Sequence, residues 1–122
     1  MTKNRLGLLV LALVAAATFA LPAAAHRTTT TAATLGVTAG LPGEFKFKLS
    51  KTSVPKGKVT IIVTNRGNLP HDFKIAGKKT PLLQSGKSAK LVVTFTKAGK
   101  FAYMCTVSGH AAAGMKGNLV VK

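Results

Sequence analysis

Short runs of alternating apolar and polar residues follow one another from Leu35 to the end of the chain. In residues 44–50, Phe45, Phe47 and Leu49 alternate with polar residues, which is the period-two pattern of a strand with one buried face. Glycine, proline and asparagine separate the runs, and none has the period of an amphipathic helix. We therefore expect an all-β domain, a sandwich or small barrel, with strands at residues 35–39, 44–50, 58–65, 71–75, 88–96, 101–105 and 117–122.

The alternation also predicts the direction of two chemically notable side chains. Cys105 shares one face of its strand with the aromatic residues two and four positions before it, because side chains alternate along a strand. His71 shares a face with Phe73 for the same reason. Apolar faces point into the core, so we expect Cys105 and His71 to face inward at strand ends. If their strands are neighbours, the two side chains can meet.

The loop CTVSGHAAAGM, residues 105–115, carries the chain's only cysteine together with a histidine and a methionine. Gly109 lets the backbone turn before the histidine, and small residues follow it. A thiolate and two imidazoles in a trigonal arrangement, with a weak thioether, form the ligand set of a mononuclear blue-copper site. Thiolate and thioether suit Cu(I), and imidazole binds both oxidation states. The predicted ligands of one copper ion, which alternates between Cu(I) and Cu(II), are His71, Cys105, His110 and Met115.

Each of these four residues also has an explanation that needs no metal. A lone cysteine is often a buried structural thiol, and a methionine often fills a gap in a core. His71 could be a core histidine bonded to the backbone, and His110 could be a surface residue of its loop. Only the four together, in this order and with this strand parity, favour the copper site.

The first 25 residues have the features of a secretory signal peptide. Lys3 and Arg5 precede an uncharged apolar run, and the three alanines at 23–25 offer a cleavage site. An uncleaved membrane anchor is the alternative, although the run is short for a membrane span. We therefore expect export to the periplasm, the cell envelope or the extracellular space.

Residues 26–34 are rich in threonine and alanine, and we expect them to form a flexible linker before a domain at residues 35–122. Cleavage after residue 25 would make His26 the N-terminal residue. Its amine and imidazole could then chelate Cu(II) together, although a coincidence at the start of a linker is the simpler explanation.

Basic residues outnumber acidic residues by 18 to 2, which gives a formal net charge of +16. Such a charge favours acidic proteins, anionic membrane surfaces or nucleic acid as partners. The lysines are spread singly along every segment, which suits exposed strand faces better than a nucleic-acid groove. We therefore expect an acidic redox partner protein and a monomer, keep an anionic membrane surface as an alternative, and expect no nucleic acid.

Two segments resemble the cupredoxins, the family of small blue-copper proteins. NLPHDF at residues 68–73 is similar to the segment with the family's first histidine ligand, and GKFAYMCTVSGHAAAGMKGNLVV at residues 99–121 is similar to its Cys–His–Met loop. The resemblance extends over residues 35–122. It implies a Greek-key β-sandwich of about seven to eight strands that holds a type 1 copper and carries single electrons. The ligands that it implies are His71, Cys105, His110 and Met115.

The resemblance also implies roles for residues beside the ligands. Asp72 would tie the two ligand loops together through the backbone near Thr106, unless it simply faces solvent. Pro70 would stiffen the approach to His71. Electrons would enter through the exposed edge of a ligand histidine and the apolar patch around it, which consists of Leu69, Pro70, His110, Ala111, Ala112 and Ala113.

The chain departs from plastocyanins within this family. Met104 stands where plastocyanins have an aromatic residue before the cysteine, and acidic residues are nearly absent. A photosynthetic role is therefore disfavoured. The sequence also lacks a second histidine cluster for a catalytic copper, so we expect an electron carrier and not an enzyme.

Three functions remain open from the sequence. The leading hypothesis is an exported electron carrier. The second is a periplasmic or cell-surface protein that binds copper for delivery or storage. The third is a sandwich domain that docks to anionic surfaces and binds copper only incidentally.

Overall fold

The structure is a computed structural model that describes residues 15, 17, 19–25 and 32–122. Within these residues it contains strands and no helix, so no described helix is long and apolar enough to cross a membrane. Most of the expected signal peptide and residues 26–31, including His26, lie outside the described residues. The strands are β1 (Ala33–Ala39), β2 (Phe47–Leu49), β3 (Ser53–Val54), β4 (Gly57–Asn65), β5 (Lys74–Ile75), β6 (Lys78–Lys79), β7 (Ser88–Phe95), β8 (Gly99–Met104) and β9 (Lys116–Val121).

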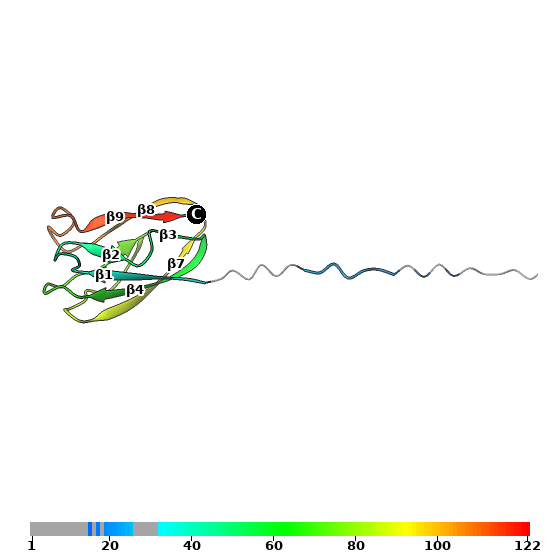
Figure 1. The fold of residues 1–122 in the computed structure, drawn as a ribbon, viewed down its shortest axis with the longest axis horizontal. Coiled ribbons are helices and arrows are strands. Elements are labelled where there is room, and N and C mark those ends of the chain that lie inside the picture. Colours follow the sequence, from blue (N-terminus) through cyan, green and yellow to red (C-terminus); the bar gives the residue numbers. More distant parts are fainter. Residues whose placement is uncertain (1–14, 16, 18, 26–31) are drawn as a thin grey trace, which may run out of the picture.

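The strands form two sheets that pack face to face, which confirms the expected β-sandwich (Figure 1). One sheet has the order β2-β1-β4-β7, and the other has the order β3-β9-β8-β5-β6. Both sheets are mixed, because β1 runs parallel to β4 and β3 runs parallel to β9. Parallel neighbours cannot be joined by a tight hairpin, so the chain crosses between the sheets to make these pairs.

Several predicted strand bounds were wrong by a few residues. β1 begins at Ala33, so the last two residues of the expected linker pair with β4. The strand expected at residues 44–50 is shortened to Phe47–Leu49, because Lys46 N–H donates to the Gly43 carbonyl in a turn. The strand expected at 71–75 is reduced to its last two residues, and His71 forms only an isolated bridge with Leu83.

Two strands of only two residues, β3 and β6, were not predicted, so the described residues hold nine strands where about seven to eight were expected. A pair of residues is too short to carry an alternating pattern. Ser53 and Val54 pair with the last strand, and Lys78 and Lys79 pair with β5. Both belong to the outer positions of the second sheet, where pairing partners are set by the tertiary fold.

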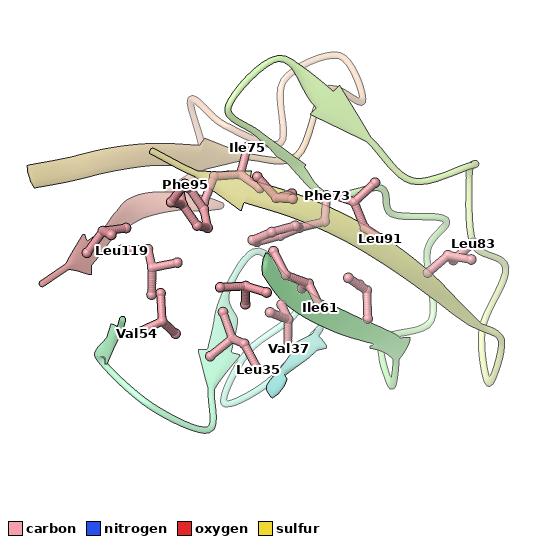
Figure 2. Close-up of a cluster of buried hydrophobic side chains, with 14 residues drawn as sticks. Leu35, Val37, Val54, Ile61, Phe73, Ile75, Leu83, Leu91, Phe95 and Leu119 are labelled. Carbon is pink, nitrogen blue, oxygen red and sulfur yellow. The ribbon is translucent and has the colours of Figure 1, made fainter. Parts of the chain in front are cut away.

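The core lies between the two sheets and is made by the apolar face of each strand (Figure 2). Along β4, Val59, Ile61 and Val63 are buried, and the residues between them are not. Figure 2 draws Ile61 and Phe73 pointing toward one another from opposite layers. Burying a side chain of this size contributes about 1.5–3 kcal/mol relative to leaving it exposed.

One end of the sandwich collects the loops that matter for function. β1, β4 and β8 all end there, and the loop between β8 and β9, orange in Figure 1, lies at the end opposite the C-terminus. The loops after β1 and β4 approach so closely at Gly40 and Gly67 that a Cβ on Gly40 would overlap the backbone of Gly67. Gly40 also has a φ of +81°, a conformation that other residues adopt only with strain.

Candidate metal centre

Three side chains from separate segments converge at this end of the sandwich. Potential ligand atoms of His71, Cys105 and His110 all lie within 4.8 Å of one another. The two Nδ1 atoms are 3.1 Å apart, and Cys105 Sγ is 3.6 Å from His110 Nδ1. All three residues are buried. The inward direction predicted for Cys105 and His71 is therefore confirmed, as is their meeting.

Backbone hydrogen bonds fold the loop of residues 105–115 back on itself. Cys105 N–H donates to the Met115 carbonyl, and Met115 N–H donates to the His110 carbonyl, each at 3.0 Å. Gly109 has a φ of +81°, which allows the expected turn before His110. Met115 is fully buried in a small cluster with Cys105 and Ala39. The fourth predicted ligand thus lies beside Cys105 and His110, and its coordination to copper stays a prediction.

The position of His71 depends on Asn65, a residue that the sequence reasoning missed. His71 and Leu83 exchange two backbone hydrogen bonds, at 2.8 and 3.1 Å. Asn65 Nδ2 donates to the carbonyls of Leu69 and Leu83, and its Oδ1 accepts from Gly67 N–H. This buried amide therefore fixes both the loop before His71 and the segment that pairs with it. In the sequence, Asn65 is the last residue of an apolar strand and is followed by Arg-Gly. This pattern predicts a turn and gives no sign of the role of Asn65.

Glu44 was also missed, and it contacts a predicted ligand directly. Its Oε1 lies 2.7 Å from His71 Nε2, the ring nitrogen that points away from the cluster. The same carboxylate accepts hydrogen bonds from the backbone N–H groups of Asn68 and Leu69. Those two bonds, and then the one with His71, lower the pKa of Glu44 to about 2. Because Glu44 lay within an expected strand, nothing in the sequence suggested that a turn would direct it at the histidine.

Asp72 ties the two ligand loops together, as the resemblance implied. Its Oδ1 accepts from Thr106 N–H at 2.6 Å, and its Oδ2 accepts from the Thr106 hydroxyl. Asp72 is buried, so the solvent-facing alternative is wrong. Since Thr106 follows Cys105, these bonds hold the segment that carries the sulfur against the segment that carries His71.

The residues of the predicted electron entry surround His110 to different extents. His110 itself is only 8% exposed. Phe45 packs edge-on against its ring, with the two ring centroids 5.1 Å apart. Leu69 is 42% exposed, and Pro70 is partly buried. In the ligand loop, Ala111 is partly buried and the next two alanines are exposed. An apolar surface thus adjoins a largely covered imidazole.

Burial shifts the pKa of two residues of the cluster, Cys105 and His110. It raises the pKa of the Cys105 thiol and lowers the pKa of the His110 imidazole. The thiol therefore holds its proton and the imidazole is neutral, and a metal ion would displace the thiol proton when it binds. One thiolate and two neutral imidazoles in a water-poor site, with a thioether alongside, fit copper by the softness of the donors.

Comparison with known proteins decides the family. A family model described as a cupredoxin-like domain matches residues 9–121. The chain belongs to the cupredoxin-like family. Cupredoxins bind copper, and in this cupredoxin His71, Cys105 and His110 are placed as a metal site. The fold agrees with that of auracyanin from Roseiflexus castenholzii, which aligns with a TM-score of 0.64 at 22% identity over 75% of this chain and 98% of that one.

Two curated relatives of this cupredoxin are copper-resistant cuproproteins named CopI. The protein from Pseudomonas aeruginosa is 49% identical over 41 residues, which are 34% of this chain and 23% of the relative. The protein from Rubrivivax gelatinosus is 28% identical over an alignment that covers 63% of this chain and 60% of the relative. The chain therefore spans less than two thirds of the length of these relatives.

Proposed function

We propose that this protein is an exported blue-copper protein that binds one copper ion and carries single electrons between redox partners. The observation that supports this most directly is the convergence of His71, Cys105 and His110, whose ligand atoms lie within 4.8 Å. Met115 returns to the same point and would supply the weak thioether ligand. When bound, copper supplies a one-electron couple that the side chains of the chain do not have.

The protein would hold the ligands in fixed positions and shield them from water. Asn65 and Asp72 fix the two ligand loops by hydrogen bonds that exist without metal. A site whose donors are held in place before metal binds changes little between oxidation states, and a small rearrangement favours fast electron transfer. Phe45 packs against the His110 ring and Met115 is buried beside Cys105, so both limit the access of water to the cluster.

Electrons would enter and leave through His110. The patch of Leu69, Pro70 and the alanines that follow His110 offers an apolar surface for a short-lived encounter. Lysines elsewhere on the surface would attract an acidic partner protein over a longer range. We expect the protein to act as a monomer and without enzymatic activity of its own.

A visible spectrum of the copper-loaded protein tests the proposal. The Cu(II) form should show an intense thiolate-to-copper charge-transfer band, and Cys105→Ser should remove it because an alcohol cannot replace the thiolate. Ser108→Ala is the matched control, since Ser108 is an exposed residue of the same loop. A colourless wild-type Cu(II) protein, or a band that survives in Cys105→Ser, would refute the proposed site.

A second function, copper delivery or storage, is favoured by the likeness to the copper-resistant CopI proteins. The two functions differ in how fast the protein releases copper to a chelator and in how fast it transfers electrons. A carrier should give reversible voltammetry with fast self-exchange and keep its copper against a chelator for hours. A copper handler should give up copper to the same chelator within minutes and cycle slowly.

A further inference from the structure

The whole chain has two acidic residues, and the structure brings both to the metal end of the sandwich. Asp72 binds the segment after Cys105, as the family resemblance implied. Glu44 is the carboxylate that contacts a predicted ligand, His71. Glu44 therefore places a negative charge beside His71 in a chain with 18 basic residues.

The contacts of Glu44 are specific. Oε1 accepts from Leu69 N–H at 3.0 Å and lies 2.7 Å from His71 Nε2, and Oε2 accepts from Asn68 N–H at 2.9 Å. Two backbone donors therefore orient the carboxylate, whatever the state of the metal site. The carboxylate is partly covered, with 25% of its side chain exposed, and the His71 side chain is fully buried.

The glycine at position 67 makes this contact possible. A Cβ there would overlap the Glu44 carboxylate and would lie within 2.9 Å of His71 Nε2. Gly67 N–H is in turn held by Asn65. The loop between β4 and His71 is thus shaped to leave room for the carboxylate beside the imidazole.

The tautomer of His71 follows from these contacts. A carboxylate accepts hydrogen bonds and cannot donate, so the hydrogen of a neutral His71 ring lies on Nε2. Nδ1 is then left with a free lone pair, and it is the atom that lies 3.1 Å from Nδ1 of His110. A carboxylate–histidine–metal arrangement fixes the ring orientation and raises the basicity of the ligand atom.

We propose that Glu44 is a positioning residue that presents His71 Nδ1 to copper and biases the site toward Cu(II). The inference rests on the proposed function and deepens it. The carboxylate adds a negative charge one imidazole ring away from the metal. The more highly charged ion gains more from that charge than Cu(I) does, so Glu44 lowers the reduction potential and slows the loss of oxidised copper.

Glu44→Gln removes the charge and keeps the contact with His71, because the amide oxygen can still accept from His71 Nε2 and Leu69 N–H. Only the hydrogen bond from Asn68 N–H is lost. The matched control is Thr96→Lys, which also raises the net charge by one. Thr96 is exposed and follows β7, so it lies roughly 20 Å away, the length of β8, from Cys105. Copper affinities, by chelator competition in each oxidation state, and reduction potentials are measured for both variants and the wild type.

We expect Cu(II) affinity to fall by about 10-fold in Glu44→Gln, the lower end of the effect of changing a ligand's hydrogen-bond partner, because the hydrogen bond from His71 remains and only the charge beside it is lost. Cu(I) affinity should fall less. A tenfold change in the ratio of the two affinities raises the potential of a one-electron couple by about 59 mV. Thr96→Lys should leave both values near those of the wild type. A Glu44→Gln potential equal to that of Thr96→Lys would overturn the inference.

A measurement on the metal-free wild-type protein keeps the test independent of how the variants fold. Nitrogen-15 chemical shifts of the His71 ring should report the tautomer with hydrogen on Nε2, and the opposite tautomer would overturn the inference. This measurement needs no copper. A wild-type protein without the charge-transfer band would therefore contradict the proposed function, and the ring tautomer would still decide the role of Glu44.

Discussion

Replacing Asp72 by alanine should loosen the connection between the two ligand loops. The carboxylate is buried and makes two hydrogen bonds to Thr106, one to its backbone N–H and one to its hydroxyl. Alanine removes both acceptors and leaves the backbone N–H of Thr106 without its partner. These two hydrogen bonds hold the segment after Cys105 against the segment that carries His71.

The magnitude follows from the type of bond. A hydrogen bond to a charged group contributes about 1.5–3 kcal/mol to stability, and the exposure of Thr106 places each of these bonds at the lower limit. Two such bonds give about 3 kcal/mol. For a domain of this size, each kcal/mol moves the melting temperature by about 4–8 °C, so we expect a fall of roughly 12–24 °C.

Thermal unfolding of the metal-free protein, followed by circular dichroism, measures this effect without interference from copper. Asp72→Asn is the control, because asparagine keeps an oxygen for Thr106 N–H and offers an amide donor to the hydroxyl. It should lose about 1 kcal/mol or less. If Asp72→Ala melts within about 2 °C of the wild type, the carboxylate does not hold the loops together, and the reasoning fails.

Two further variants test other parts of the site. Asn65→Ala removes three hydrogen bonds from a fully buried position and should cost about 3 kcal/mol in the same unfolding assay, and a cost below about 1 kcal/mol would contradict the role given to Asn65. Met115→Leu conserves volume and should change stability by less than about 1.5 kcal/mol. It should nevertheless raise the reduction potential, because it removes an electron donor that stabilises the oxidised ion. An unchanged potential and an unchanged Cu(II) spectrum would mean that Met115 does not coordinate.

The fold class and the ligand cluster could be predicted because both depend on short-range patterns. Alternation placed Cys105 and His71 on inward faces, and one loop carried both His110 and Met115. The donor set of one thiolate, two imidazoles and a thioether then favoured copper. Strand bounds were less predictable wherever a turn overrode the alternation, as it does at residues 43–46.

The residues that were missed act over long distances in the sequence. Glu44 and His71 are 27 positions apart, and Asn65 and Leu83 are 18 apart. Their contacts depend on how the loops after β1 and β4 pack, which no local pattern reports. Glu44 looked like an ordinary polar residue at the start of a strand, and only the turn at its position directs it to His71.

The register of β8 has a consequence for how the protein matures. Met104 pairs with Lys74 on one side and with Lys116 on the other, and Cys105 follows directly. A slip of a single position in either pairing would turn the thiol to the outside, because successive side chains face opposite ways. Copper can be captured only by molecules in which both ladders are correctly aligned. Copper binding would therefore stabilise only the molecules whose strands are correctly paired, and mispaired molecules would remain without copper.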